Sequence, residues 1–315
     1  MEHFRIILNQ EIVFLITIAI GYMVFKLRLL EKDSLQTLSR LFSNVTLPFL
    51  ILVNTVEGAA RKDLTSSFYV IAIEIAMYVV LISFNRLMIR LCRLRENRAR
   101  IYLLSASFGN MGFVGIPLIM SVYGQRAMIY VSLFTLVDQA LLWTYGVSLS
   151  HPYDSSEAKL RFDKSTLKKL LNPPLIATIC ALILISFNLK FPASVGTAFR
   201  NISNASIPLP FLYLGGMLAI SDCGKILKEW PVYVIVVSKM LIFPVVLFVC
   251  LRCFGLNSEV NGVFLVLAGL PCLAVAPMLA KENGSDETLA TAATSLTTVA
   301  SIITFPILFY ITSLI

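Results

Sequence analysis

The sequence predicts an all-α membrane protein with about ten transmembrane helices, built as two inverted five-helix repeats. The first observation is composition: 57% of the residues are hydrophobic and 14% are charged, too few charges to cover a water-facing surface. The second is that apolar residues occur in blocks of roughly 17–25, each long enough to cross about 30 Å of hydrocarbon. The third is a set of residues that recurs at one fixed spacing in both halves of the chain.

The apolar blocks predict where the helices lie. They are expected at residues 9–26, 35–57, 66–91, 99–122, 125–148, 172–189, 201–220, 230–252, 259–281 and 287–314. The first block has no small-residue cleavage site, so it is expected to be a helix and not a cleaved signal peptide. The polar stretch 150–171 is expected to be a cytoplasmic linker between a first repeat, residues 1–149, and a second, residues 172–315.

Basic residues are distributed unequally between the two sides of the predicted membrane. The loops and helix ends that follow the odd-numbered helices hold 18 Lys and Arg residues, whereas the opposite side holds 7. Cytoplasmic loops carry an excess of Lys and Arg, so both termini are predicted to lie outside the cytoplasm. The bias also supports an even number of spans.

The two halves of the sequence match at an offset of 160 residues. At this offset Ser43-Asn44-Val45-Thr46-Leu47-Pro48 falls on Ser203-Asn204-Ala205-Ser206-Ile207-Pro208, and Gly109, Pro117 and Gly124 fall on Gly269, Pro277 and Gly284. Several coincidences at one offset indicate duplication. Because each unit has five spans, the second enters the membrane from the opposite side, which produces an inverted repeat.

Segments 99–122 and 259–281 contain residues that disfavour a straight helix. The first holds three glycines and Pro117 within nine residues, and the second holds Pro271 and Pro277. In a helix interior glycine costs about 1 kcal/mol and proline about 3 kcal/mol. Backbone left unpaired at membrane depth must line a polar cavity or be covered by protein. We therefore expect both segments to break near these prolines and to face each other; the alternative is close helix packing with simple kinks.

Such breaks would create a site for an anion. Proline suits the first turn of a helix, so Pro117 and Pro277 are expected to begin the second halves. Each new N-terminus carries a partial charge of roughly +0.5 and free N–H donors. Two of them facing one cavity can receive a carboxylate without a fixed cation in the site. Asn110 adds an amide that can donate to the anion or cap a helix end.

Three ionisable residues fall inside apolar blocks: Glu74, Asp138 and Lys239. Charged groups at this depth are functional or paired. Glu74 and Lys239 are expected to form a structural ion pair, with a role in transport as the alternative. Asp138 and Gln139 directly follow the first broken segment and are expected to contact substrate or a proton, although a hydrogen-bonded structural aspartate is an equal alternative.

Several functions are excluded or not expected. Both histidines, His3 and His151, lie outside the apolar blocks, which excludes a histidine-built metal site or catalytic triad inside the membrane. No nucleophile with an adjacent base is found, so an enzyme, a metal ion or an organic cofactor is not expected. The net charge of +8 is distributed over alternate loops, which is typical of membrane topology and not of nucleic-acid binding.

At both predicted breaks the sequence resembles the auxin efflux carrier family, whose best-known branch contains the plant PIN-formed auxin transporters. Asn110-Met-Gly-Phe-Val-Gly-Ile-Pro117-Leu matches that branch's Asn-Thr-Leu-Val-Met-Gly-Ile-Pro-Leu. Pro277-Met-Leu-Ala-Lys281-Glu282 is similar to its Pro-Phe-Val-Phe-Ala-Lys-Glu. The likeness covers the whole chain.

The resemblance implies a fold like that of the bile acid–sodium symporters. Segments 9–26, 35–57, 172–189 and 201–220 would form a scaffold, and segments 66–91, 99–122, 125–148, 230–252, 259–281 and 287–314 a mobile transport domain in which the broken segments cross. It also implies a homodimer joined through the scaffold, elevator-type alternating access, and weak organic acids such as indole acetate, malate and malonate as substrates. By the same resemblance Asn110 helps to hold the carboxylate and Gln139 lies near the substrate.

Two departures from the plant branch bear on the substrate. About 20 residues replace the large cytoplasmic loop of many plant members. The stretch Leu270-Pro-Cys-Leu-Ala-Val-Ala-Pro277 is one residue longer between its prolines, so Cys272 and Leu273 would shape the pocket differently. The short loops favour a multi-pass protein of a prokaryotic inner membrane over a plant carrier of auxin.

The sequence thus predicts a secondary transporter of mono- or dicarboxylates, with a ligand-binding membrane sensor as the alternative. The predicted substrate-binding residues are Asn110, Gly112, Gly115, Pro117, Asp138, Gln139, Pro271, Cys272, Ala276 and Pro277. The expected partners are the small carboxylate, membrane lipid and a second copy of the chain. Coupling to H⁺ or Na⁺ is left open, as is the direction of transport.

Overall fold

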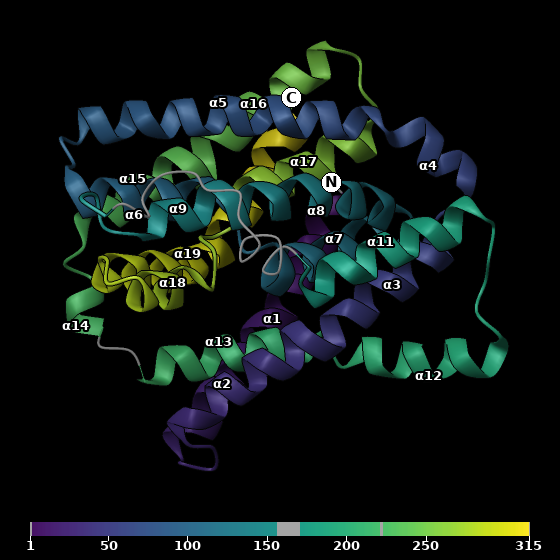
Figure 1. Cartoon of the computed structure of the whole chain (residues 1–315), viewed down its shortest axis with the longest axis horizontal. Coiled ribbons are helices and arrows are strands. Elements are labelled where there is room, and N and C mark those ends of the chain that lie inside the picture. Colours follow the sequence, from purple (N-terminus) through teal and green to yellow (C-terminus); the bar gives the residue numbers. More distant parts are fainter. Residues whose placement is uncertain (1, 156–170, 221–222, 315) are drawn as a thin grey trace.

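The computed structural model describes residues 2–155, 171–220 and 223–314, and this part of the chain is built from helices. Figure 1 shows α5 and α12 running roughly along the long axis of the view, whereas α2 and α3 cross it obliquely. The one extended pairing in the described residues is an isolated bridge between Gly109 and Cys272. The predicted all-α class is therefore confirmed.

The helices follow the predicted apolar blocks. In chain order they are α1 (Glu2–Lys26), α2 (Lys32–Leu41), η1 (Phe42–Thr46), α3 (Leu47–Gly58), α4 (Arg61–Ser67), α5 (Tyr69–Leu91), α6 (Glu96–Ser107), η2 (Met111–Gly115), α7 (Ile116–Tyr123), η3 (Gln125–Ala127), α8 (Met128–Leu141), η4 (Leu142–Gly146), α9 (Val147–Ser150), α11 (Pro173–Ser186), α12 (Ala193–Asn204), α13 (Pro208–Ile220), α14 (Cys223–Ile226), α15 (Trp230–Val237), η6 (Ser238–Ile242), α16 (Phe243–Cys253), α17 (Ser258–Gly269), α18 (Ala276–Glu282) and α19 (Glu287–Leu314).

Six helical stretches of the described residues are long and apolar enough to cross a membrane, by length and composition. They are Asp33–Gly58, Arg61–Leu91, Gln125–Ser150, Ala193–Ile220, Trp230–Cys253 and Glu287–Leu314. Four further apolar helices are shorter, and two of these, Met111–Tyr123 and Ser258–Gly269, are halves of the segments predicted to break. Ten full spans and the inverted repeat remain predictions, and the predicted linker 150–171 lies largely outside the described residues.

The predicted helix 201–220 is wrong in its extent. The structure begins this stretch at Ala193 and divides it into α12 and α13, with a turn at residues 205–207 just before Pro208. Proline disfavours the α conformation of the residue that precedes it, which accounts for the division.

Three helical stretches contain a wider, π-helical turn just before a proline. The turns η1, η2 and η6 end two residues before Pro48, Pro117 and Pro244. A proline inside an α-helix removes one hydrogen bond and its ring clashes with the carbonyl four residues earlier. The π turn inserts one residue and relieves this clash, so each helix continues past its proline.

The close packing of α1 against α13 depends on glycine. A Cβ atom on Gly215 would lie 2.1 Å from the carbonyl oxygen of Ile18, and one on Gly21 would lie 2.4 Å from that of Leu212. The two backbones are therefore in direct contact. Small residues permit such an approach in membranes, where van der Waals packing and not hydrophobic burial holds helices together.

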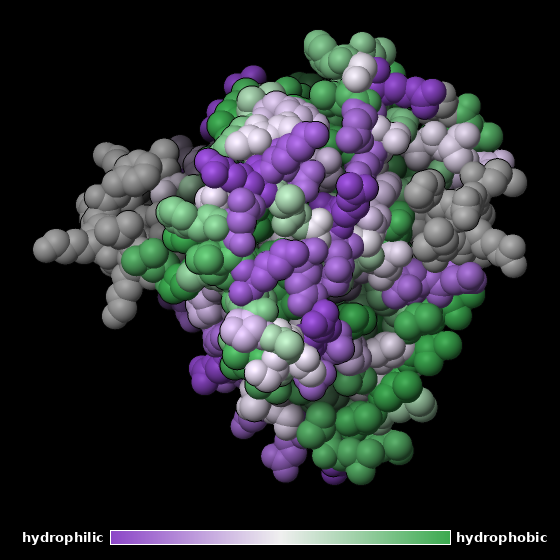
Figure 2. All heavy atoms as spheres, turned by 90° about the vertical axis from the view of Figure 1, so that its right-hand side faces the viewer, coloured by the Kyte–Doolittle hydropathy of each residue, from purple (hydrophilic) through white to green (hydrophobic). Residues whose placement is uncertain are grey.

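One end of the helical body is polar. The short helix α4 lies at one end, and Arg61 and Lys62 in its first turn are exposed. Viewed from this end, hydrophilic residues form a band across the face and hydrophobic residues border it (Figure 2). This arrangement fits helices that cross an apolar layer with their ends in water.

Replacing Gly215 by alanine should destabilise the fold, because the added methyl group would meet the α1 backbone. Overpacking of this kind costs about 1–3 kcal/mol. The measurement is thermal unfolding in detergent. Gly196→Ala is the control, since a Cβ there would lie 3.5 Å from its nearest neighbour. Equal unfolding temperatures for the two variants would contradict direct backbone contact between α1 and α13.

Candidate functional site

Both segments predicted to break are interrupted. The first is helical up to Ser107 and again from Met111, and the second is helical up to Gly269 and again from Ala276. The two gaps therefore lie at residues 108–110 and 270–275. This confirms the prediction of two breaks and excludes simple kinks.

The two gaps hydrogen-bond to each other. The amide of Asn110 donates to the carbonyl of Pro271 at 2.9 Å, and the amide of Leu273 donates to the carbonyl of Phe108 at 3.1 Å. These two bonds close the antiparallel bridge that faces Gly109 toward Cys272. Peptide groups that have left their helices are thus paired with one another, as is required where water is excluded.

Side chains of two other helices complete the second gap. Thr297 of α19 accepts a hydrogen bond from the amide of Cys272 at 2.9 Å, and Thr294 donates to the carbonyl of Leu273 at 2.9 Å. Lys239 of η6 donates to the carbonyl of Leu270. The gap is therefore a fixed structure, held from three directions.

The predicted role of the two prolines is right for one and wrong for the other. Pro277 lies in the first turn of α18, as expected. Pro117 does not begin its half-helix, because the helical turns already resume at Met111 and run through η2 into α7. The free N-terminus of this half-helix lies at Asn110. Asn110 is the N-cap, because its side chain accepts a hydrogen bond from the amide of Phe113 in the first turn.

A cavity of about 670 Å³ lies beside the first gap. It is bordered by α2, η1, η2, α8 and α18, by the first residues of α11, and by residues 273–275 of the second gap. Four of the predicted residues line it, namely Asn110, Gly112, Asp138 and Gln139; the other six, Gly115, Pro117, Pro271, Cys272, Ala276 and Pro277, are not among its lining residues. From the second gap, the cavity is lined instead by Leu273, Ala274 and Val275.

Tertiary packing explains why the remaining residues lie elsewhere. Pro271 and Cys272 form the bridge, and the Cys272 side chain is fully buried. Gly115 faces Leu270, to which a Cβ at Gly115 would come within 3.1 Å. The bridge therefore turns these residues into the protein, away from the cavity.

Asn110 is the polar group best placed to bind a ligand. It is 2% exposed and lines the cavity. Its Oδ1 accepts a hydrogen bond from the amide of Phe113 at 3.4 Å. Its Nδ2 has no hydrogen-bond partner among the described residues. A buried amide donor without a partner costs about 1–3 kcal/mol, so the site favours a bound acceptor.

Asp138 and Gln139 border the cavity within a hydrogen-bonded network. Tyr78 donates to Oδ1 of Asp138 at 2.5 Å, and Gln139 donates to Oδ2 at 3.1 Å. The Gln139 carbonyl oxygen in turn accepts from Trp143 at 3.0 Å and Asn172 at 2.8 Å. Both Asp138 oxygens are thus occupied, which fits the alternative of a structural aspartate. Contact with substrate stays a prediction.

The sequence reasoning did not anticipate a cation at the cavity. Arg40, which is exposed on α2, borders it, as does the exposed carboxylate Glu282. The expectation of a pocket without any fixed cation is therefore wrong. Arg40 lies one turn before the Ser43-Asn44 pair that recurs in both halves, and this spacing could have indicated it.

The predicted ion pair between Glu74 and Lys239 is not formed. Glu74 is fully buried, and neither carboxylate oxygen has a hydrogen-bond partner in the described part of the chain. Lys239 is instead bonded to the Leu270 carbonyl. The Leu270 carbonyl in the gap of the second broken segment requires a hydrogen-bond donor, and the Lys239 ammonium supplies it.

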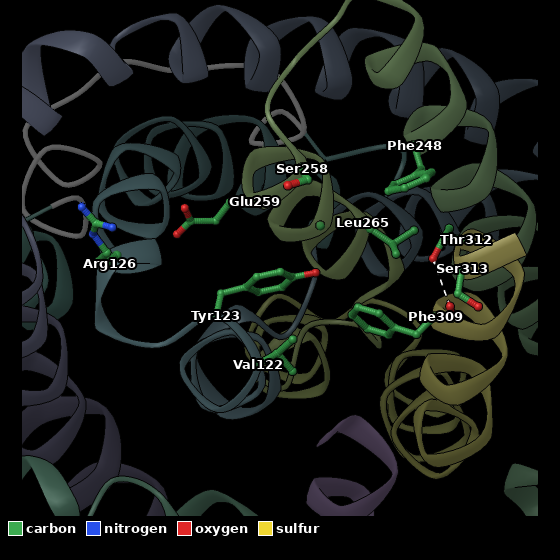
Figure 3. Close-up of a pocket in the computed structure, with 11 residues that line it drawn as sticks. Val122, Tyr123, Arg126, Phe248, Ser258, Glu259, Leu265, Phe309, Thr312 and Ser313 are labelled. Carbon is green, nitrogen blue, oxygen red and sulfur yellow. Dashed lines mark hydrogen bonds between the residues drawn. The ribbon is translucent and has the colours of Figure 1, made fainter. Parts of the chain in front are cut away.

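A second cavity, of about 510 Å³, lies near the other end of the half-helices (Figure 3). Tyr123 extends across it toward α17, and Arg126 and Glu259 lie on one side while Phe248 and Phe309 lie on the other. None of the predicted substrate-binding residues lines it. The first cavity is therefore the candidate site.

Replacing Thr297 by valine should loosen the second gap. The substitution keeps the shape of the side chain but leaves the Cys272 amide unpaired, a loss of about 1–3 kcal/mol. Thr312→Val is the matched control on the same helix, because Thr312 bonds to carbonyls of its own helix, those of Leu308 and Phe309. Thermal unfolding should separate the two variants. A Thr297→Val variant as stable as the control would show that the gap does not depend on this bond.

Comparison with known proteins agrees with this architecture. The model of a family described as membrane transport protein matches residues 7–310. The chain is 25% identical over 303 residues to an uncharacterized transporter of Methanothermobacter thermautotrophicus, covering 93% of this chain and 94% of the relative. It is 22% identical over 279 residues to an uncharacterized transporter of Methanocaldococcus jannaschii, covering 84% and 85%. The chain is a multi-pass membrane protein that belongs to the auxin efflux carrier family of membrane transport proteins.

Proposed function

We propose that the protein is a secondary transporter that moves small organic acid anions, mono- or dicarboxylates, across the cell membrane. Family membership supports the class of transporter. The substrate class rests on one observation, the buried Nδ2 of Asn110 that lines a large cavity without a partner. A carboxylate oxygen is the acceptor that this donor lacks, and a hydrogen bond to a charged group contributes about 1.5–3 kcal/mol.

The electrostatics around Asn110 support an anion. The helical turns η2 and α7 run without a gap from Met111 to Tyr123, so their N-terminus carries partial positive charge at the cavity. Arg40 contributes a full positive charge at its border, where the exposed carboxylate of Glu282 also lies, so the partial charge of the buried helix N-terminus is the main attraction for an anion. The anion would lie between the amide of Asn110 and this guanidinium, with the apolar side chains of Leu47, Ile51 and Met111 around its hydrocarbon part.

The position of the cavity supports alternating access. The helices α2, η1 and α11 on one side correspond to the scaffold implied by the family resemblance, and η2, α8 and α18 on the other to the mobile domain. Movement of the second group along the first would carry a bound anion across the membrane. We propose an elevator-type movement in a homodimer joined through the scaffold, with both termini outside the cytoplasm.

Asn110→Asp should abolish carboxylate uptake into proteoliposomes while the protein stays folded. Aspartate keeps the oxygen that caps the helix but replaces the donating amide by a negative oxygen, so the variant separates capping from substrate binding. Asn110→Ala should weaken transport about tenfold or more, the loss expected for one hydrogen bond to a charged group.

Ser258→Ala, in the second cavity, is the control and should transport as the unchanged protein does. Normal uptake by folded Asn110→Asp would remove Asn110 from the site. If the unchanged protein binds labelled carboxylates but does not move them, transport is wrong and the membrane-sensor alternative is favoured.

A further inference from the structure

In the described part of the chain, three buried side chains can carry a full charge at neutral pH. They are Glu74 on α5, Asp138 on α8 and Lys239 on η6, which are 0%, 5% and 1% exposed. If all were ionised, two negative charges would face one positive charge inside membrane-spanning helices. A buried charge without compensation costs several kcal/mol. Neutrality requires one additional positive charge.

A proton on one of the two carboxyl groups would supply this positive charge, and the hydrogen bonds indicate which group carries it. Asp138 accepts from Tyr78 and from Gln139, and such bonds stabilise the ionised form. Glu74 has no donor at either oxygen among the described residues, although it is the more deeply buried of the two. An ionised Glu74 would exchange its hydration for no more than the nearby backbone amide of Asp138. Asp138 is therefore the carboxylate, and Glu74 is the neutral acid.

The groups around Glu74 agree with this assignment. Asp138 faces it from α8, and Tyr78, one turn away on α5, gives its hydroxyl hydrogen to Asp138. Both neighbours disfavour a second negative charge.

The cations of the neighbouring helices are bonded elsewhere. Lys239 donates to the Leu270 carbonyl. On α6, Arg98 pairs with Glu229 and with Asp286, and Arg100 donates to the Ser148 and His151 carbonyls. No basic side chain of η6 or α6 in the described residues is thus hydrogen-bonded to Glu74.

A proton satisfies Glu74 better than a metal cation does. Hard metal cations are held by several oxygen ligands together, whereas neither Glu74 oxygen makes a hydrogen bond among the described residues, and the donor near them is the backbone amide of Asp138. A proton needs no added space.

We propose that Glu74 is the proton-binding site of the transporter and that its proton is moved together with the substrate anion. This inference rests on the proposed function. The link is Asp138, which borders the substrate cavity and also faces Glu74. An anion arriving in the cavity adds negative charge near Asp138, so Glu74 must keep its proton while the anion is bound. The proton is bound before the monoanion; after the movement both are released to water on the other side, and Glu74 takes up the next proton from water once the carrier has returned. Each cycle thus moves one proton with one monoanion.

Infrared spectroscopy of the purified protein tests the protonation without any substrate. A protonated carboxylic acid has a C=O stretching band that a carboxylate lacks. We expect this band at neutral pH in the unchanged protein and its loss in Glu74→Gln. A band that is absent from the unchanged protein, or that is kept in Glu74→Gln, overturns the proposal.

Proteoliposomes test the coupling. With the membrane potential clamped, an inward proton gradient should drive accumulation of a labelled monocarboxylate by the unchanged protein. Glu74→Gln should retain exchange of labelled for unlabelled carboxylate but lose the accumulation. Glutamine has the shape of the neutral acid, so the variant should also unfold within a few degrees of the unchanged protein; marked destabilisation would show that an ionised Glu74 is needed and would overturn the proposal.

The two hypotheses fail differently in this assay. No exchange of any carboxylate by the unchanged protein contradicts the proposed function. Two results contradict the proton site alone. In the first, the unchanged protein exchanges carboxylate but a proton gradient drives no accumulation. In the second, Glu74→Gln still accumulates carboxylate when a proton gradient is imposed.

Discussion

The pair of backbone hydrogen bonds between the two interrupted helices is the interaction on which the rest of the structure depends. Each interruption leaves peptide groups without a partner in their own helix, and an unpaired peptide group in hydrocarbon costs several kcal/mol. Asn110 pairs with Pro271 and Leu273 pairs with Phe108, so each gap supplies what the other lacks. Neither interruption would be tolerated alone.

The candidate site follows from this solution. The bridge uses the backbone amide of Asn110, the resumed helix uses its Oδ1, and the Nδ2 remains available at the cavity. A single residue thus holds the gap, caps the helix and presents a donor. Because the first two roles fix its orientation, the donor is positioned before any substrate arrives, which lowers the entropy cost of binding.

The buried ionisable groups are divided between structure and chemistry. Lys239 serves the second gap by bonding to the Leu270 carbonyl, and α19 contributes Thr294 and Thr297 to the same gap. Asp138 is engaged by Tyr78 and Gln139 at the border of the cavity. Glu74 is left outside both networks. The distribution of hydrogen bonds, and not the mere presence of charges in the membrane, distinguishes the roles of these residues.

Composition, apolar blocks and the density of glycine and proline were enough to predict a multi-pass helical protein, two interrupted helices and Asn110 at the first interruption. These are local properties, since helix-breaking residues act on their own backbone wherever the helix lies. Only the tertiary structure decided which residues line the cavity. The bridge turns Pro271 and Cys272 inward and brings Leu273 to the cavity, α2 brings Arg40, and the Leu270 carbonyl captures Lys239 in place of Glu74. These contacts depend on which segments lie next to each other in the folded protein. Hydropathy and local propensity describe each segment separately, so they cannot predict contacts between distant segments.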